Sequence, residues 1–188
     1  MLDKLPADLD PNTKLSALLG EVARRHAQLN ASLSHLWRSL ATPSLAEVLL
    51  PDLMDQLATQ SRMMLAGVEA FTDGEKAMGY SAIEYTRQVH AVRNDLLHQT
   101  WILHEPEGEG QYWTRRRLPR QHRPEEETPP QRLANVAEVV IALATAEFRI
   151  FLLTQMLNHV RHPDEAEWLV PWASDEQVWA WIGGQPIG

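Results

Sequence analysis

The sequence predicts an all-α protein, a bundle of four main helices with short additional helices. Over residues 14–40 apolar residues recur at alternating spacings of three and four, as on the buried face of a packed helix, and further apolar stripes with helical spacing follow. The chain has 188 residues, 44% of them hydrophobic, with 9 glycines and no cysteine. A chain of this length can bury a stable core without a metal or a disulfide, and short connections favour antiparallel neighbours.

The first helix is predicted over residues 14–40, where leucines and Val22 repeat every three or four positions. Asn12 or Thr13 is expected to cap its start. Pro43 ends it, because a proline disfavours helical dihedrals in the residue before it.

A second helical region is expected after this turn. Ser44 can cap a short segment to Leu50, and Pro51 then kinks that helix or opens a new one. The stripe that continues the second helix consists of Leu53, Leu57, Met64, Val68 and Phe71.

The third helix is predicted from about Ser81 to about Leu103, after a connection punctuated by Gly74 and Gly79. Residues 105–130 then change character, from acidic and glycine-containing to arginine-rich, which indicates an inserted loop. Within that loop, residues 112–114 are expected to form a short extended segment.

The fourth helix is predicted from Leu133 to Val160, after a start signal in which two prolines follow Thr128. It is apolar on most faces and should be central. We therefore expect residues 1–162 to form the bundle and residues 163–188 to form a tail that packs on it or on a dimer interface. This tail holds four of the seven tryptophans, which are Trp168, Trp172, Trp179 and Trp181.

Composition excludes several functions. A net charge of −8 argues against a general binder of nucleic acid or anionic membranes, although a local basic patch stays open. The absence of cysteine removes thiol catalysis and cysteine-bound metals. The first residues lack the features of a signal peptide, and Glu147 and Arg149 interrupt the most apolar stretch. We expect a cytoplasmic protein without a membrane segment, metal or cofactor.

Polar side chains share one face of the predicted third helix. A helical wheel places Arg87, His90, Asn94, His98 and Trp101 roughly opposite an apolar stripe. The stripe can enter the bundle, which leaves the polar face to solvent, a ligand or another subunit. The apolar residues of the stripe are Tyr85, Val89, Val92, Leu96 and Leu103.

The run Arg93-Asn94-Asp95-Leu96-Leu97-His98, with Trp101 three residues beyond it, resembles the R-N-x-x-x-H signature of the HEPN superfamily of helical proteins, many of which are ribonucleases. The helical context is also similar over roughly residues 14–160. One departure is Gln99, where related sequences often have a small residue.

This resemblance implies a metal-independent endoribonuclease that leaves a 2′,3′-cyclic phosphate, of the kind found in toxin–antitoxin or antiviral systems. It assigns the general base to His98 and phosphate stabilisation to Arg93, with Asn94 in support. Residues five apart on a straight helix point about 140° away from each other. The resemblance implies that a homodimer brings both groups into one cleft; Arg87, His90 and Trp101 are further candidates for contacts with RNA.

Two other interpretations remain open. The polar face can be a solvated or dimerising surface, which makes the chain a noncatalytic HEPN-like adaptor that binds a protein, such as an antitoxin, or a nucleotide. The loop arginines can grip an RNA backbone, or they can pair with neighbouring glutamates. His26, on the seam of the first helix, is expected to be a satisfied core or interface histidine without a catalytic role. The loop arginines are Arg115, Arg116, Arg117, Arg120 and Arg123.

Overall fold

The computed structural model describes Pro6 and residues 8–41, 53–105, 110–116, 130–161 and 173–186. Within these residues the chain forms five helices and one two-stranded sheet, which confirms the mostly helical class. The helices are α1 (Pro11–Leu40), α3 (Met54–Ala66), α4 (Asp73–Leu97), α5 (Leu133–Arg161) and α6 (Asp175–Gly183). The strands are β1 (Thr100–His104) and β2 (Tyr112–Arg116).

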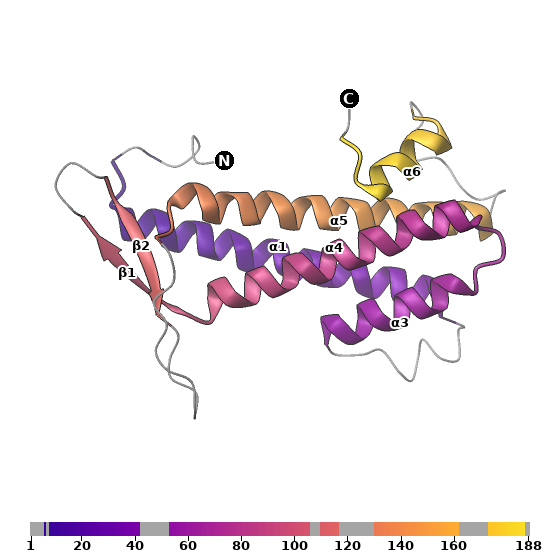
Figure 1. Ribbon diagram of the computed structural model, residues 1–188, viewed down its shortest axis with the longest axis horizontal. Coiled ribbons are helices and arrows are strands. Elements are labelled where there is room, and N and C mark those ends of the chain that lie inside the picture. Colours follow the sequence, from indigo (N-terminus) through magenta and orange to yellow (C-terminus); the bar gives the residue numbers. More distant parts are fainter. Residues whose placement is uncertain are drawn as a thin grey trace.

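Three long helices, α1, α4 and α5, lie side by side, with α3 and α6 against one end and the hairpin at the other (Figure 1). Helices α1 and α5 run in the same direction. Arg25 lies 3.5 Å from Glu147, and the guanidinium of Arg161, further along α5, donates to the carbonyl of Ser39, further along α1. The expected antiparallel arrangement therefore holds for α4 against both neighbours but not for α1 against α5. A parallel pair is allowed here because two helices and the hairpin separate α1 from α5.

Helix α1 begins three residues before its predicted start. The side chain of Asp10 accepts a hydrogen bond from the backbone N–H of Thr13 at 3.0 Å, and Pro11 takes the first helical position. Asp10 is thus the cap, in place of Asn12 or Thr13. The predicted apolar face is buried in the core.

Helix α3 is shorter than the stripe that predicted it. It ends at Ala66, so Val68 and Phe71 lie in the connection to α4, although both side chains are buried. The short helix expected between Ser44 and Leu50, with Pro51 after it, falls outside the described residues.

Helix α4 begins at Asp73, eight residues before the predicted start. Thr72 and Glu75 form a capping box, in which each side chain bonds the other residue's backbone N–H. Gly79 is therefore inside the helix, where its missing side chain lets α4 approach α3 and α5. A Cβ atom at this position would lie 2.7 Å from Cδ2 of Leu65 and 3.3 Å from Cδ1 of Leu153.

The predicted third helix runs past the observed C-terminal end of α4. Helix α4 stops at Leu97, and β1 pairs with β2 in an antiparallel hairpin that sets Trp101 opposite Arg115. Trp101 and Leu103 consequently lie on a strand, not on the helix face assigned to them. The indole N–H of Trp101 donates to the carbonyl of Leu96 at 3.1 Å and ties the hairpin to α4. The extended segment expected at residues 112–114 is part of β2.

Helix α5 occupies the predicted central position, with buried residues on the sides that face α1, α4 and α6. Helix α6 packs against α4 and α5, and the ring of its Trp179 meets the ring of Phe71, in the connection before α4, edge-on at 4.9 Å. The described part of the tail therefore covers the bundle, while Trp168 and Trp172 lie outside the described residues. None of the described helices is long and apolar enough to cross a membrane.

Candidate functional site

Four polar side chains from α1 and α4 form one connected cluster. Nε2 of His26 lies 2.8 Å from Nδ1 of His90, and Nε2 of His90 lies 2.9 Å from Nδ2 of Asn94. Oδ1 of Asn94 accepts a hydrogen bond of 2.7 Å from Nη1 of Arg93. We call these four residues the relay cluster. It joins two helices through residues that are 64 positions apart in the sequence.

The donors and acceptors of these side chains assign a direction to the series of hydrogen bonds. A guanidinium only donates, so Oδ1 of Asn94 must accept from Arg93 and the amide NH₂ must face His90. Nε2 of His90 then accepts, which places the ring proton on Nδ1 and directs it at His26. Both imidazoles are therefore neutral, and every link runs from Arg93 towards His26.

The electrostatic surroundings also favour neutral rings. Burial lowers the pKa of His26 to about 4, with further contributions from the charge of Arg93 and from His90. Burial also lowers the pKa of His90; Asp55 opposes this, and Arg93 reinforces it. At pH 7 the cluster carries a single formal charge, the guanidinium of Arg93.

In the part of the chain that the structure describes, no carboxylate lies against Arg93. None of the ion pairs within the described residues includes this guanidinium, and its hydrogen bond to Asn94 is to a neutral amide. Its Nε is buried without a hydrogen-bond partner in the described structure, and burial lowers its pKa. A partly buried cation of this kind would be stabilised by an anion.

His98 does not join the relay cluster. It is the C-cap of α4, its backbone N–H bonds the carbonyl of Asn94 at 3.2 Å, and its side chain is exposed. The structure thus brings Arg93 and Asn94 together with His90 and leaves His98 at the helix end. A catalytic pair of Arg93 and His98 would need a second chain.

The remaining predicted RNA contacts have other partners. Arg87 lies 3.1 Å from Glu84 and 4.0 Å from Asp55. Arg115 pairs with Asp95 at 2.9 Å and lies over the ring of Trp101, 5.6 Å from its centre. A carboxylate that holds Arg115 is thus on α4.

The structure describes only one of the other loop arginines. Arg116 is exposed at the end of β2. Arg117, Arg120 and Arg123 lie outside the described residues.

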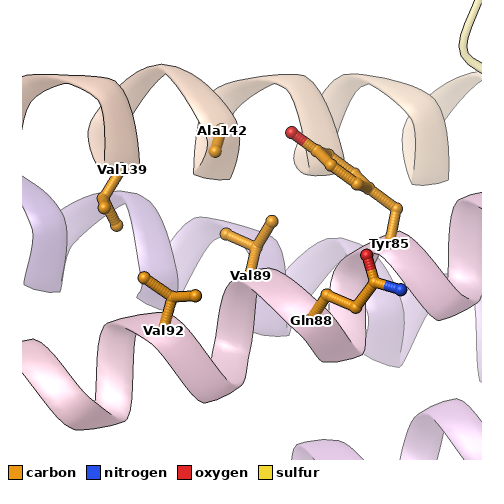
Figure 2. Close-up of a pocket in the computed structure, with 6 residues that line it drawn as sticks. All are labelled: Tyr85, Gln88, Val89, Val92, Val139 and Ala142. Carbon is orange, nitrogen blue, oxygen red and sulfur yellow. The ribbon is translucent and has the colours of Figure 1, made fainter. Parts of the chain in front are cut away.

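An open hollow of about 230 Å³ lies between α4 and α5 (Figure 2). Val89 and Val92 line it from α4, and Val139 and Ala142 line it from α5. The side chain of Val92 is 49% exposed, although its neighbour Arg93 is partly buried. Tyr85 and Gln88 also line this hollow from α4, and the rest of its lining is apolar.

The described residues contain no group of three histidines, aspartates or glutamates placed to bind a metal ion. His26 and His90 each use a ring nitrogen on the other. Sequence reasoning expected His26 to be satisfied, and it is, but it missed the partner. The one signal available was a histidine on an otherwise apolar seam, and pairing it with His90 requires the packing of α1 on α4.

Comparisons with known proteins found no matching family model, curated protein or solved structure.

Proposed function

We propose that the chain is a metal-independent endoribonuclease in which Arg93 binds the scissile phosphate and His98 accepts the proton of the ribose 2′-hydroxyl. The observation that carries this proposal is the partly buried guanidinium of Arg93, which has a neutral amide beside it and no carboxylate among the described residues. Phosphate, like carboxylate, fits the planar donors of arginine in a bidentate geometry.

The chemistry needs no protein nucleophile. The 2′-oxygen attacks phosphorus as His98 takes its proton, the bond to the 5′-oxygen breaks, and a 2′,3′-cyclic phosphate and a 5′-hydroxyl are released. Arg93 stabilises the negative charge that develops on the phosphoryl oxygens. The leaving 5′-oxygen receives a proton from a second imidazolium or from water.

A homodimer would complete the site, because His98 and Arg93 of one chain are separated along α4. In a dimer that places two α4 ends together, His98 of one copy faces Arg93 of the other. The exposed position of His98 and the exposed side chain of Val92 beside Arg93 support this arrangement.

The test is cleavage of single-stranded RNA by the purified full chain in EDTA. His98→Ala and Arg93→Gln should each lower the rate about 10²-fold or more, the usual range for loss of acid–base or oxyanion stabilisation. His35→Ala and Arg38→Gln alter exposed residues of the same types on α1 and should cut at the wild-type rate. Undiminished cleavage in folded His98→Ala would reject the mechanism.

A noncatalytic adaptor is the second candidate, and the apolar hollow beside the exposed Val92 favours it. In that case the folded wild-type protein cuts no RNA in the assay above. Val92→Asp would then abolish association with the partner or the second copy, as measured by light scattering, while the helical content stays unchanged.

A further inference from the structure

We propose that His26 and His90 are positioning residues, which hold the guanidinium of Arg93 in one orientation through a one-way chain of hydrogen bonds across the α1–α4 contact. This inference rests on the proposed function only for the purpose that it gives to Arg93. The relay cluster itself is defined by the distances of 2.8, 2.9 and 2.7 Å that join its members.

Within the relay cluster, each hydrogen-bond acceptor restricts the conformation or tautomer of the residue that donates to it. Arg93 has a long side chain with many rotamers, and Oδ1 of Asn94 selects those in which Nη1 points at it. An asparagine amide can flip, but the lone pair on Nε2 of His90 holds the NH₂ end in place. A neutral imidazole has two tautomers, and Nε2 of His26 selects the one with the proton on Nδ1 of His90.

This series of hydrogen bonds can form only while both imidazole rings are neutral. A proton on Nε2 of His90 would face the NH₂ group of Asn94; if the amide then flipped, its NH₂ would face the guanidinium of Arg93. Of the charged groups around His90, Asp55 on α3 favours the charged ring, and Arg93 on α4 disfavours it. Burial between the helices is the largest effect and also disfavours the charged ring of His90, which keeps the direction of the hydrogen bonds fixed.

The contribution of His26 crosses the interface between two helices. Because it comes from α1, the orientation of Arg93 depends on the packing of α1 against α4 and not on α4 alone. A histidine that merely filled space here would be replaceable by an apolar side chain of similar size.

The first experiment determines the tautomers by nitrogen NMR of the ¹⁵N-histidine-labelled full chain at pH 7. His26→Gln and His90→Gln identify the two signals. We expect neutral rings, with both His26 and His90 protonated on Nδ1, whereas the Nε2–H form predominates for free histidine. A charged ring, or an Nε2–H tautomer at His90, would overturn the proposal.

Reversing the hydrogen bond between Asn94 and His90 gives a second readout. Asn94→Asp replaces the donor to His90 with a carboxylate that can only accept, so Nε2 of His90 must carry a proton and its titration midpoint should rise by about one pH unit or more. Asn158→Asp adds the same charge on α5 and should leave the signals of His26 and His90 in place. An unchanged His90 in Asn94→Asp would contradict the assigned direction.

The positioning role is tested by the Nε–H resonance of Arg93 and by RNA cleavage in two variants of His26. His26→Gln supplies an amide oxygen that can still accept from His90, so both readouts should stay near those of wild type. His26→Leu cannot accept, so the Arg93 resonance should shift and kcat should fall about fivefold, the usual effect of one lost hydrogen bond. Circular dichroism checks that both variants fold.

The outcomes separate this inference from the proposed function. If no RNA is cut but the tautomers and the Arg93 resonance behave as expected, the relay stands and the nuclease proposal fails. If RNA is cut and His26→Leu leaves the Arg93 resonance and kcat unchanged, the nuclease proposal stands and the positioning role is rejected.

Discussion

Gly20 and Gly79 both lie inside helices, but their surroundings are opposite. A Cβ atom at Gly20 would meet nothing within 4 Å, whereas one at Gly79 would lie 2.7 Å from Cδ2 of the buried Leu65. Alanine is favoured over glycine in a helix interior by about 1 kcal/mol, and overpacking a core costs about 1–3 kcal/mol. The same substitution should therefore act in opposite directions at the two sites.

We expect Gly20→Ala to raise the free energy of unfolding by about 0.5–1 kcal/mol and Gly79→Ala to lower it by about 1 kcal/mol or more. Urea denaturation followed by circular dichroism measures both. Two stabilised variants would mean that α3 and α5 can move away from α4 at little energetic cost.

His26 makes stability depend on pH. Its pKa is about 4 in the folded chain against an ordinary value of 6.5, so between these values the unfolded chain binds a proton that the folded chain does not. Stability is therefore complete above pH 6.5 and declines as the pH falls towards 4. Because the ring is only half-buried, solvent screening reduces the expected loss between pH 7 and 5 to about 1 kcal/mol.

His26→Gln removes this titration. Urea denaturation at pH 7 and pH 5 should give a smaller difference in unfolding free energy for His26→Gln than for wild type. His90 keeps some dependence in the variant, since its pKa is lowered as well. An equal difference in the two proteins would show that His26 does not carry the effect. His35→Gln, on the exposed side of α1, is the matched control.

Residues adjacent in sequence were the predictable part of the site. Arg93 and Asn94 could be assigned together through the sequence signature, and Asn94 and His90 to one polar face, because residues four apart lie on the same side of a helix. His26 and His90 could not be paired, because the contact depends on how far α1 slides along α4. The partner of Arg115 was missed for the same reason: Asp95 reaches it only once the hairpin folds back on α4.

At the scale of elements, α6 is held to the bundle by the buried guanidinium of Arg149. Its Nε donates to the carbonyl of Ile182 at 2.7 Å, and Nη2 donates to Oγ of Ser81 at 3.1 Å. The guanidinium also lies over the ring of Tyr85, 4.9 Å from its centre. One side chain of α5 therefore connects the end of α6 to α4.

Arg149→Met keeps an apolar stem of similar reach but removes these donors. We expect a loss of about 1–3 kcal/mol in unfolding free energy, since the carbonyl of Ile182 loses its partner. Hydrogen exchange should speed up in α6 and stay unchanged in α1. Arg161→Met, which removes an exposed guanidinium that bonds Ser39, should change stability by less than about 1 kcal/mol. Unchanged exchange in α6 would reject this role for Arg149.

The ends of elements were harder to predict than their interiors. Gly74 and Gly79 resemble loop punctuation in sequence, yet the capping box of Thr72 and Glu75 starts α4 before both. Beyond Leu97 the helical spacing of apolar residues continues, but the bulky and β-branched side chains of residues 100–102 also suit a strand. Pairing with β2, a tertiary contact, decides between these two local preferences.

At the scale of the whole molecule, the net charge of −8 limits how RNA can bind. Affinity for RNA falls with salt in proportion to the number of phosphates that cations neutralise. Within the described residues, four arginines pair with carboxylates, and these are Arg24, Arg25, Arg87 and Arg115. Arg93 instead donates to the neutral amide of Asn94. The proposed site should therefore engage few phosphates, in contrast to a loop that grips an extended backbone.

This difference can be measured by titrating a fluorescent single-stranded RNA into inactive His98→Ala over a series of salt concentrations. A site centred on Arg93 should give a slope of log Kd against log salt of about 1–2, since each phosphate contact on a single strand contributes about 0.7. Arg93→Gln in the same background should lower the slope by about 0.7, and Arg38→Gln should not change it. If the slope is about 3 or more and Arg93→Gln leaves it unchanged, the phosphate contacts are made by other cations. The arginines of residues 115–123 would then be the first to substitute.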